Sequence, residues 1–114
     1  MADSLLNFNT YQQESRSTAI YPEIRGSEVY PVLGLVNEAG EVAGKVKKIY
    51  RDGDGEYKVS DLDALKGELG DVLWYLSQIA TELGLSLSDI AETNLEKLRS
   101  RQERGVLGGS GDKR

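Results

Sequence analysis

The chain has 114 residues, a formal net charge of −5, and hydrophobic and charged fractions of 39% and 29%, values that fit one soluble globular domain. The acidic balance argues against non-specific binding of nucleic acid, which usually needs a basic surface. The chain contains no cysteine and no histidine. This excludes disulfides, thiolate chemistry, zinc–thiolate sites and imidazole bases, including those of Ser-His-Asp triads.

The beginning of the chain and its apolar runs indicate where the protein is expected to work. Residues 1–4 lack the basic segment that opens a signal peptide. No apolar run approaches the ~18 residues of a membrane span. We therefore expect a cytoplasmic protein that has no membrane partner.

Two helices are predicted in the first half of the chain. The first is short, covers about residues 10–20, has Asn9 as its N-cap and stops before Pro22. The second is long and covers about residues 28–50, because a proline near its start is tolerated in a first turn. A loop rich in glycine and aspartate follows at 51–55.

Two further helices are predicted in the second half. The third covers about residues 61–83, opened by the capping pattern of Ser60 and Asp63 and ended by Gly84. The fourth covers about residues 87–104 and has the same kind of boundaries, at Ser86, Asp89 and Gly105.

No segment alternates apolar and polar residues with the period of two that is typical of strands. The expected fold is therefore all-α, an antiparallel four-helix bundle. Residues 1–107 form the expected domain, and residues 108–114 form a glycine-rich C-terminal tail.

Four carboxylates are the main functional signal. Glu38 and Glu41 lie in the second predicted helix, and Glu68 and Asp71 lie in the third. Each pair has the spacing i, i+3, so both members point the same way from a helix. Gathering like charges costs free energy unless a cation lies between them, and oxygen ligands suit Mg²⁺ first and Mn²⁺ second. The pattern indicates a metal site for hydrolysis of a phosphate ester or anhydride.

The helical phases place both pairs beside a core stripe. At about 100° per residue, the apolar residues of each helix lie roughly 20–80° from the first acid, and the second acid lies at about −60°. Packing the two stripes together would bring the acids together, whereas a solvated face would lie opposite the stripe. Lys45 and Tyr75 follow the first acids by seven positions and share the acidic line.

Glycines surround the acids in both helices, at Gly34, Gly40, Gly44, Gly67 and Gly70. Each costs up to about 1 kcal/mol relative to alanine inside a helix. The pattern fits close approach of a ligand or backbone, and it equally fits tight packing between helices.

The fourth predicted helix and the tail carry candidate phosphate ligands. Asn94 falls within the apolar arc of this helix, and Lys97 and Arg101 lie at its edge. These side chains offer amide hydrogen bonds and positive charge, although Lys97 and Arg101 also suit the edge of a core and the helix C-terminus. In the tail, Lys113 and Arg114 beside free backbone amides fit either an anion nest or a frayed terminus.

These segments resemble a known family. Residues 34–42 read GLVNEAGEV, residues 68–76 read ELGDVLWYL, and residues 94–98 read NLEKL. The acidic pattern E-x-x-E followed by E-x-x-D is similar to that of the all-α, MazG-like nucleoside triphosphate pyrophosphohydrolases. The opening around residues 11–22 and the ending from Arg101 onward resemble a small phage and bacterial subgroup. Asn37 departs from the small residue expected before the acidic motif, which puts the shape of the pocket in doubt.

The resemblance implies hydrolysis of the α–β phosphoanhydride of an NTP or dNTP to a monophosphate and pyrophosphate. It implies that Glu38, Glu41, Glu68 and Asp71 hold Mg²⁺, with Mn²⁺ as a substitute. Glu38 or Glu41 would accept a proton from water. Substrate would be bound by the basic and amide side chains Lys45, Lys48, Asn94, Lys97, Arg101, Lys113 and Arg114.

The resemblance also implies a homodimer or homotetramer that completes the bundle. Trp74 lies well off the core stripe of its helix, so it is a candidate for a subunit interface.

Other functions remain open. On the same fold the chain could be a dUTPase-like or phosphoribosyl-ATP-type pyrophosphohydrolase. A different class is a non-catalytic helical interaction module that carries its acids as a charged face.

Overall fold

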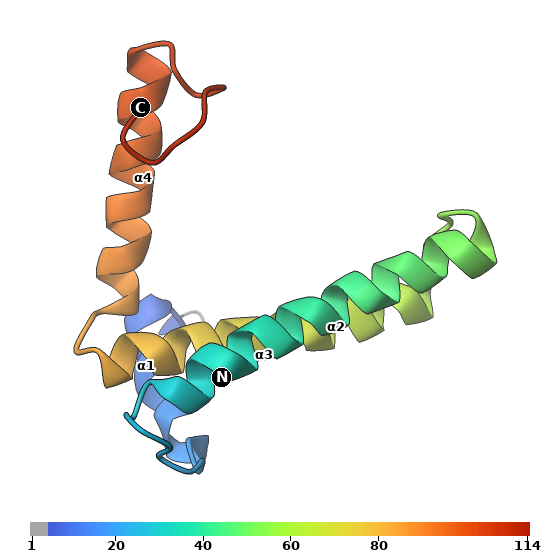
Figure 1. The fold of residues 1–114 in the computed structure, drawn as a ribbon, viewed down its shortest axis with the longest axis horizontal. Coiled ribbons are helices and arrows are strands. Elements are labelled where there is room, and N and C mark those ends of the chain that lie inside the picture. The colour runs from blue at the N-terminus through green and yellow to red at the C-terminus, as the bar shows by residue number, and fades with distance from the viewer. Residues whose placement is uncertain (1–4) are drawn as a thin grey trace.

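The computed structural model describes residues 5–114, so the first four residues of the expected domain lie outside the described part. It confirms an all-α chain with four α-helices (Figure 1). The described residues contain no strand. The elements are α1 (Phe8–Ser15), the short 3₁₀ helix η2 (Arg16–Thr18), α2 (Val29–Gly53), α3 (Val59–Glu82) and α4 (Leu87–Glu103).

The long helices α2 and α3 form an antiparallel hairpin, which Figure 1 shows as two ribbons lying side by side. The turn between them begins at Asp54, whose φ of 54° is in the left-handed region, and continues through Gly55 at 78°. The predicted cap of α3 is wrong by two residues. The Lys58 N–H donates to the Asp61 carboxylate over 2.9 Å. The cap therefore has the predicted spacing of three residues, but it starts at Lys58 instead of Ser60.

Helix α1 crosses α3 and is held mainly by polar contacts. Its N-cap is Asn7, not Asn9, because the Asn7 side chain accepts from the Thr10 N–H while the Thr10 hydroxyl accepts from the Asn7 N–H. On the facing side of α3, Gln78 is fully buried and its amide donates to the Ser15 hydroxyl over 3.0 Å. A buried amide must find such partners, so this contact fixes how α1 lies on α3.

An ion pair joins the segment after α1 to the end of α3. Arg16 Nη2 lies 2.9 Å from Glu82 Oε2, and the Tyr21 hydroxyl also donates to this carboxylate. The hydrogen bond from Tyr21 and the nearby Arg16 lower the pKa of Glu82 below its ordinary 4.5. Because the folded-state pKa is lowered, this stabilisation is present above about pH 4.5 and is lost as pH falls through the folded value.

Replacing this carboxylate tests its contribution. Glu82→Gln should lower the free energy of unfolding at pH 7 by about 1–2 kcal/mol, discounted because Arg16 is partly exposed. It should also flatten the dependence of stability on pH below 4.5. Denaturant unfolding at several pH values measures both effects. Glu92→Gln, at an exposed position of α4, is the matched control, and equal stability of the two variants would contradict this account.

Helix α4 starts as predicted but extends away from the hairpin. Gly84 has a φ of 71°, and the Ser86 hydroxyl accepts from the Asp89 N–H over 3.1 Å. Figure 1 shows that α4 touches the rest of the chain near its first turns and then projects outward. The four-helix bundle expected from the sequence is therefore not confirmed within one chain.

The apolar side chains of this open arrangement remain largely uncovered. Among the described residues, only Ile49, Ala80 and Leu87 form a buried hydrophobic core. One face of the hairpin lies at a helical phase of about 80–160° from Glu38 in α2 and from Glu68 in α3. Its apolar side chains are Val32, Val36, Leu62, Leu69 and Leu76. These side chains are 36–68% exposed. In the part of the chain that the structure describes, no helix is long and apolar enough to cross a membrane.

Candidate metal and phosphate site

The α2–α3 hairpin brings together three of the four predicted metal ligands. Glu38 from α2 and Glu68 and Asp71 from α3 each offer a carboxylate oxygen, and these oxygens all lie within 4.8 Å of one another. Two ligand oxygens on opposite sides of one Mg²⁺ are about 4.2 Å apart, from Mg–O distances of about 2.1 Å. A small movement of the side chains would therefore let this triad, Glu38–Glu68–Asp71, share one cation.

The electrostatics of the triad also suit a cation. Burial raises the pKa of Glu38, a hydrogen bond with Glu68 raises it further, and the charges of Asp71 and Glu41 act in the same direction. Without a cation, the repulsion among these carboxylates is reduced when one of them holds a proton. A hard divalent ion would relieve the same repulsion, so the oxygen-only donor set fits Mg²⁺ or Mn²⁺.

Glu41, the fourth predicted ligand, does not belong to the triad. It lies one turn beyond Glu38 on α2 and is exposed. Its charge nevertheless contributes to the raised pKa of Glu38, so it acts on the same site. Glu41 is therefore a carboxylate beside the triad that has more freedom to move.

Lysines lie along α2 beyond the acids. Lys45 Nζ is 3.7 Å from Glu68 Oε1. Lys45 and Lys48 line a hollow of about 370 Å³ between the C-terminal end of α2 and the start of α3. Lys58, from the loop before α3, joins them there. Lys58 was not predicted as a site residue, because its position depends on how the hairpin closes. Asp52, Glu56 and Asp61 also line this hollow, so its charge is balanced.

In one chain, the predicted phosphate ligands of α4 lie apart from the triad. Figure 1 shows the outer half of α4 and the tail well separated from the hairpin. Asn94, near the middle of α4, is exposed. Lys97 Nζ lies 2.7 Å from Asp112 Oδ1, and Arg101 Nη2 lies 3.0 Å from the same oxygen. One carboxylate thus holds both cations.

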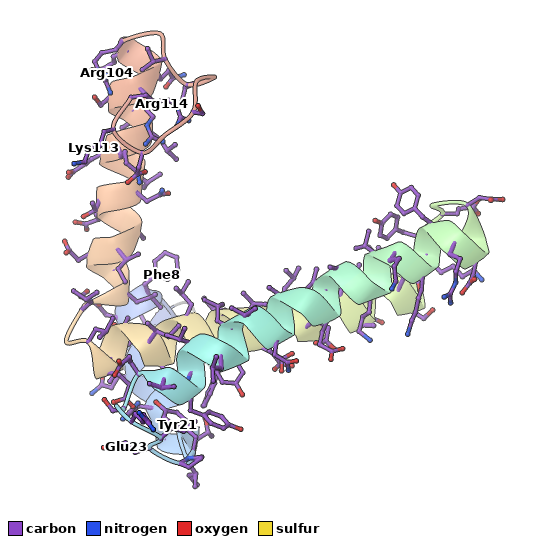
Figure 2. The ribbon with its side chains drawn as sticks, in the orientation of Figure 1. Phe8, Tyr21, Glu23, Arg104, Lys113 and Arg114 are labelled. Carbon is purple, nitrogen blue, oxygen red and sulfur yellow. The ribbon has the colours of Figure 1, made fainter. Side chains whose placement is uncertain are left out.

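The tail folds back along α4. Figure 2 shows Lys113 and Arg114 beside this helix, with Arg104 at its end. The Arg114 guanidinium donates to the backbone carbonyls of Val106, Leu107 and Gly111. The tail covers Arg101, which is only 5% exposed although its helix projects outward. In this structure Arg114 therefore fixes the loop, and the division into a domain ending at 107 and a separate tail stays a prediction.

The glycines around the acids have different surroundings. A Cβ at Gly34 would lie 2.2 Å from the Tyr75 ring, so packing within the chain explains that glycine. A Cβ at any of the others would meet no atom within 4 Å, namely at Gly40, Gly44, Gly67 and Gly70. Helix packing within one chain therefore does not account for these four.

Trp74 packs within its own chain. Its indole N–H donates to the Thr18 hydroxyl over 2.9 Å, and its ring makes edge contacts with Tyr21 and Tyr75. The position proposed for a subunit interface thus helps to hold the segment after α1 against α3.

Similarity to known proteins identifies the family of this chain. Residues 30–106 match the MazG nucleotide pyrophosphohydrolase domain. The match covers more than half of the chain and includes all four acids, so the chain belongs to the MazG nucleotide pyrophosphohydrolase domain family. It is also 48% identical over 115 residues to the Gene 37 protein of Mycobacterium phage L5, covering 96% of this chain and 100% of that protein. No solved structure matches significantly.

Proposed function

We propose that this protein is a divalent-metal-dependent pyrophosphohydrolase that cleaves the α–β phosphoanhydride of an NTP or dNTP to a monophosphate and pyrophosphate. The observation that carries the proposal is the convergence of Glu38, Glu68 and Asp71 within 4.8 Å, inside the stretch of the chain that matches the MazG domain family. When bound, Mg²⁺ or Mn²⁺ would supply charge neutralisation for the triphosphate and an acidified water as nucleophile.

The chain's own residues divide the remaining work. Glu38, Glu68 and Asp71 would hold the cation, with Glu41 able to join them. Glu41 is exposed and outside the triad, so it is the better placed of the two candidate bases, Glu38 and Glu41, to accept the proton of the attacking water. Lys45, beside Glu68, and Lys48 would stabilise the charge that develops on the phosphates.

We propose that a second copy of the chain completes the site, in a homodimer or homotetramer. In one chain α4, which carries Asn94, Lys97 and Arg101, extends away from the hairpin (Figure 1), so α4 of a partner would have to supply these side chains. The uncovered apolar face of the hairpin supports such an assembly, because soluble monomers rarely expose large contiguous apolar patches. The open space beside Gly40 and Gly44 on α2 would allow another helix to approach.

A substrate screen tests this function directly. Purified protein with Mg²⁺ or Mn²⁺ is incubated with each of the eight common NTPs and dNTPs, and pyrophosphate and monophosphate are quantified. We expect both products in equal amounts from at least one nucleotide. Release of orthophosphate alone would contradict α–β cleavage, and absence of turnover with every nucleotide would contradict the proposal.

Adding dUTP and phosphoribosyl-ATP to the screen separates the alternatives. Restriction to dUTP would indicate the dUTPase-like activity, and phosphoribosyl-ATP as the sole substrate would indicate the other pyrophosphohydrolase on this fold. A non-catalytic module would show no turnover and no thermal stabilisation by millimolar metal.

A further inference from the structure

A second hollow adjoins the triad on the side away from the lysines. It has a volume of about 270 Å³ and is lined by Ile24, Tyr30, Leu33, Gly34, Asn37 and Tyr75. None of these lining residues is charged. Its single side-chain amide belongs to Asn37, the residue directly before Glu38.

The aromatic wall of this hollow is held in place by its neighbours. Because Gly34 has no side chain, the Tyr75 ring can lie against α2, where a Cβ would be 2.2 Å from a ring carbon. Trp74 contacts Tyr75 edge-on with ring centroids 5.1 Å apart. Tyr30 stacks on Tyr21 at 5.5 Å with an interplanar angle of 6°. The two tyrosines of the hollow are thus supported from behind, which reduces the entropy lost when a ligand packs on them.

The hollow is continuous with the acidic line. Asn37 directly precedes Glu38, and Tyr75 lies one turn beyond Asp71 on α3. After burial and the effect of Tyr30, the charges of Glu38 and Asp71 raise the pKa of Tyr75, which places its hydroxyl within their influence. Along the hairpin the order is therefore the neutral aromatic hollow, then the triad, then the lysine-lined hollow.

This order matches the parts of a nucleotide. A site for an entire small ligand has a volume of about 300–1,000 Å³, so a smaller hollow suits one planar ring whose polar part lies outside. Aromatic rings stack on any nucleobase, and an amide can donate to and accept from its edge. A phosphate there would gain no cationic partner and would face the acids.

We propose that the hollow receives the nucleobase, with Tyr30 and Tyr75 as its walls, and that Asn37 determines which base is preferred. The triphosphate would then extend across the triad toward Lys45 and Lys48. This inference rests on the proposed function, because it assumes that the triad is the phosphate site.

Binding can be measured without turnover. Trp74 is the only tryptophan of the chain and touches Tyr75, so its fluorescence should respond when a base enters the hollow. Titration with the four common nucleoside monophosphates should change the fluorescence and saturate. Inorganic tripolyphosphate, which has no base, should bind in the presence of Mg²⁺ without this change. An equal response to both ligands would overturn the proposal.

Specificity is tested with Asn37→Ala, at an exposed position that should not affect folding. The ratio of kcat/KM between the best and the worst base should change by about tenfold or more, because discrimination rests on hydrogen bonds that only one base makes. Binding of tripolyphosphate in the presence of Mg²⁺ should not change. Lys47→Ala, at about 180° from Glu38 on α2, is the matched control and should leave every ratio as in the wild type.

A second variant examines the wall. Gly34→Ala should displace Tyr75 and raise the KM for every nucleotide while leaving the binding of tripolyphosphate unchanged.

Unaltered base ratios in folded Asn37→Ala would overturn the proposal. If the wild type cleaves no nucleotide but binds monophosphates in a manner that depends on Asn37, the hydrolytic function fails and the base site stands.

Discussion

Asp71→Asn should reduce the release of pyrophosphate by roughly a hundredfold or more, because it removes a proposed metal ligand whose negative charge helps to hold the cation that binds the triphosphate. The substitution keeps the size of the side chain. It also removes one of the charges that raise the pKa of Glu38. The metal-free variant should therefore be at least as stable as the metal-free wild type.

Thermal unfolding with and without metal separates loss of the site from loss of the fold. A ligand present at a hundred times its Kd stabilises the folded state by about 2.7 kcal/mol, and 1 kcal/mol corresponds to about 4–8 °C for a domain of this size. Mg²⁺ should therefore raise the unfolding midpoint of the wild type by several degrees and that of Asp71→Asn by much less. Equal midpoint shifts in both proteins would show that the metal binds elsewhere.

The pH dependence of the metal-free proteins gives a further check on this prediction. Since the folded-state pKa of Glu38 is raised, ionising it costs stability, and the metal-free wild type should become less stable as pH rises above about 4.5. This loss should be smaller in Asp71→Asn, because one repelling charge is absent. An identical pH dependence in the two proteins would contradict the electrostatic coupling between these residues.

Two impaired variants should restore activity to each other if α4 of one chain serves the triad of another. Lys97→Ala alone should lower kcat/KM by about ten- to a hundredfold, because Lys97 would contact the phosphates. In a mixed dimer of Lys97→Ala and Asp71→Asn, one of the two sites would contain an intact triad and an intact α4. Equal co-expression should then recover about a quarter of the wild-type sites, because half of randomly formed dimers are mixed.

The control for this experiment combines two variants of the triad. Asp71→Asn with Glu68→Gln should recover nothing, because both residues come from the same chain at every site. Recovery of activity in this control would contradict a site shared between chains. A lack of recovery for Lys97→Ala with Asp71→Asn would contradict it as well.

The sequence was most informative where local rules act alone. The number of helices and the boundaries at Gly84 and Ser86 follow from capping chemistry, which depends on a few adjacent residues. The meeting of Glu38 with Glu68 and Asp71 follows from helical phase, once two long apolar stripes are assumed to pack together.

Features that depend on tertiary packing were harder to predict from the sequence. Asn7 and Asn9 are equally good caps by residue type, and only the bond between Asn7 and Thr10 decides between them. The apolar stripe of α4 indicates a packing face but not what covers it, so the outward direction of this helix could not be read from periodicity. The burial of Arg101 likewise depends on Asp112, eleven residues away in a tail with few apolar side chains.

The sparse core of the single chain has a consequence for how the protein is handled. Among the described residues three apolar side chains form the buried core and many others are exposed, so if a second copy covers them as proposed, folding and self-association are one equilibrium. The midpoint of unfolding then rises with protomer concentration, and specific activity falls on dilution. Any comparison of variants must accordingly be made at one common concentration.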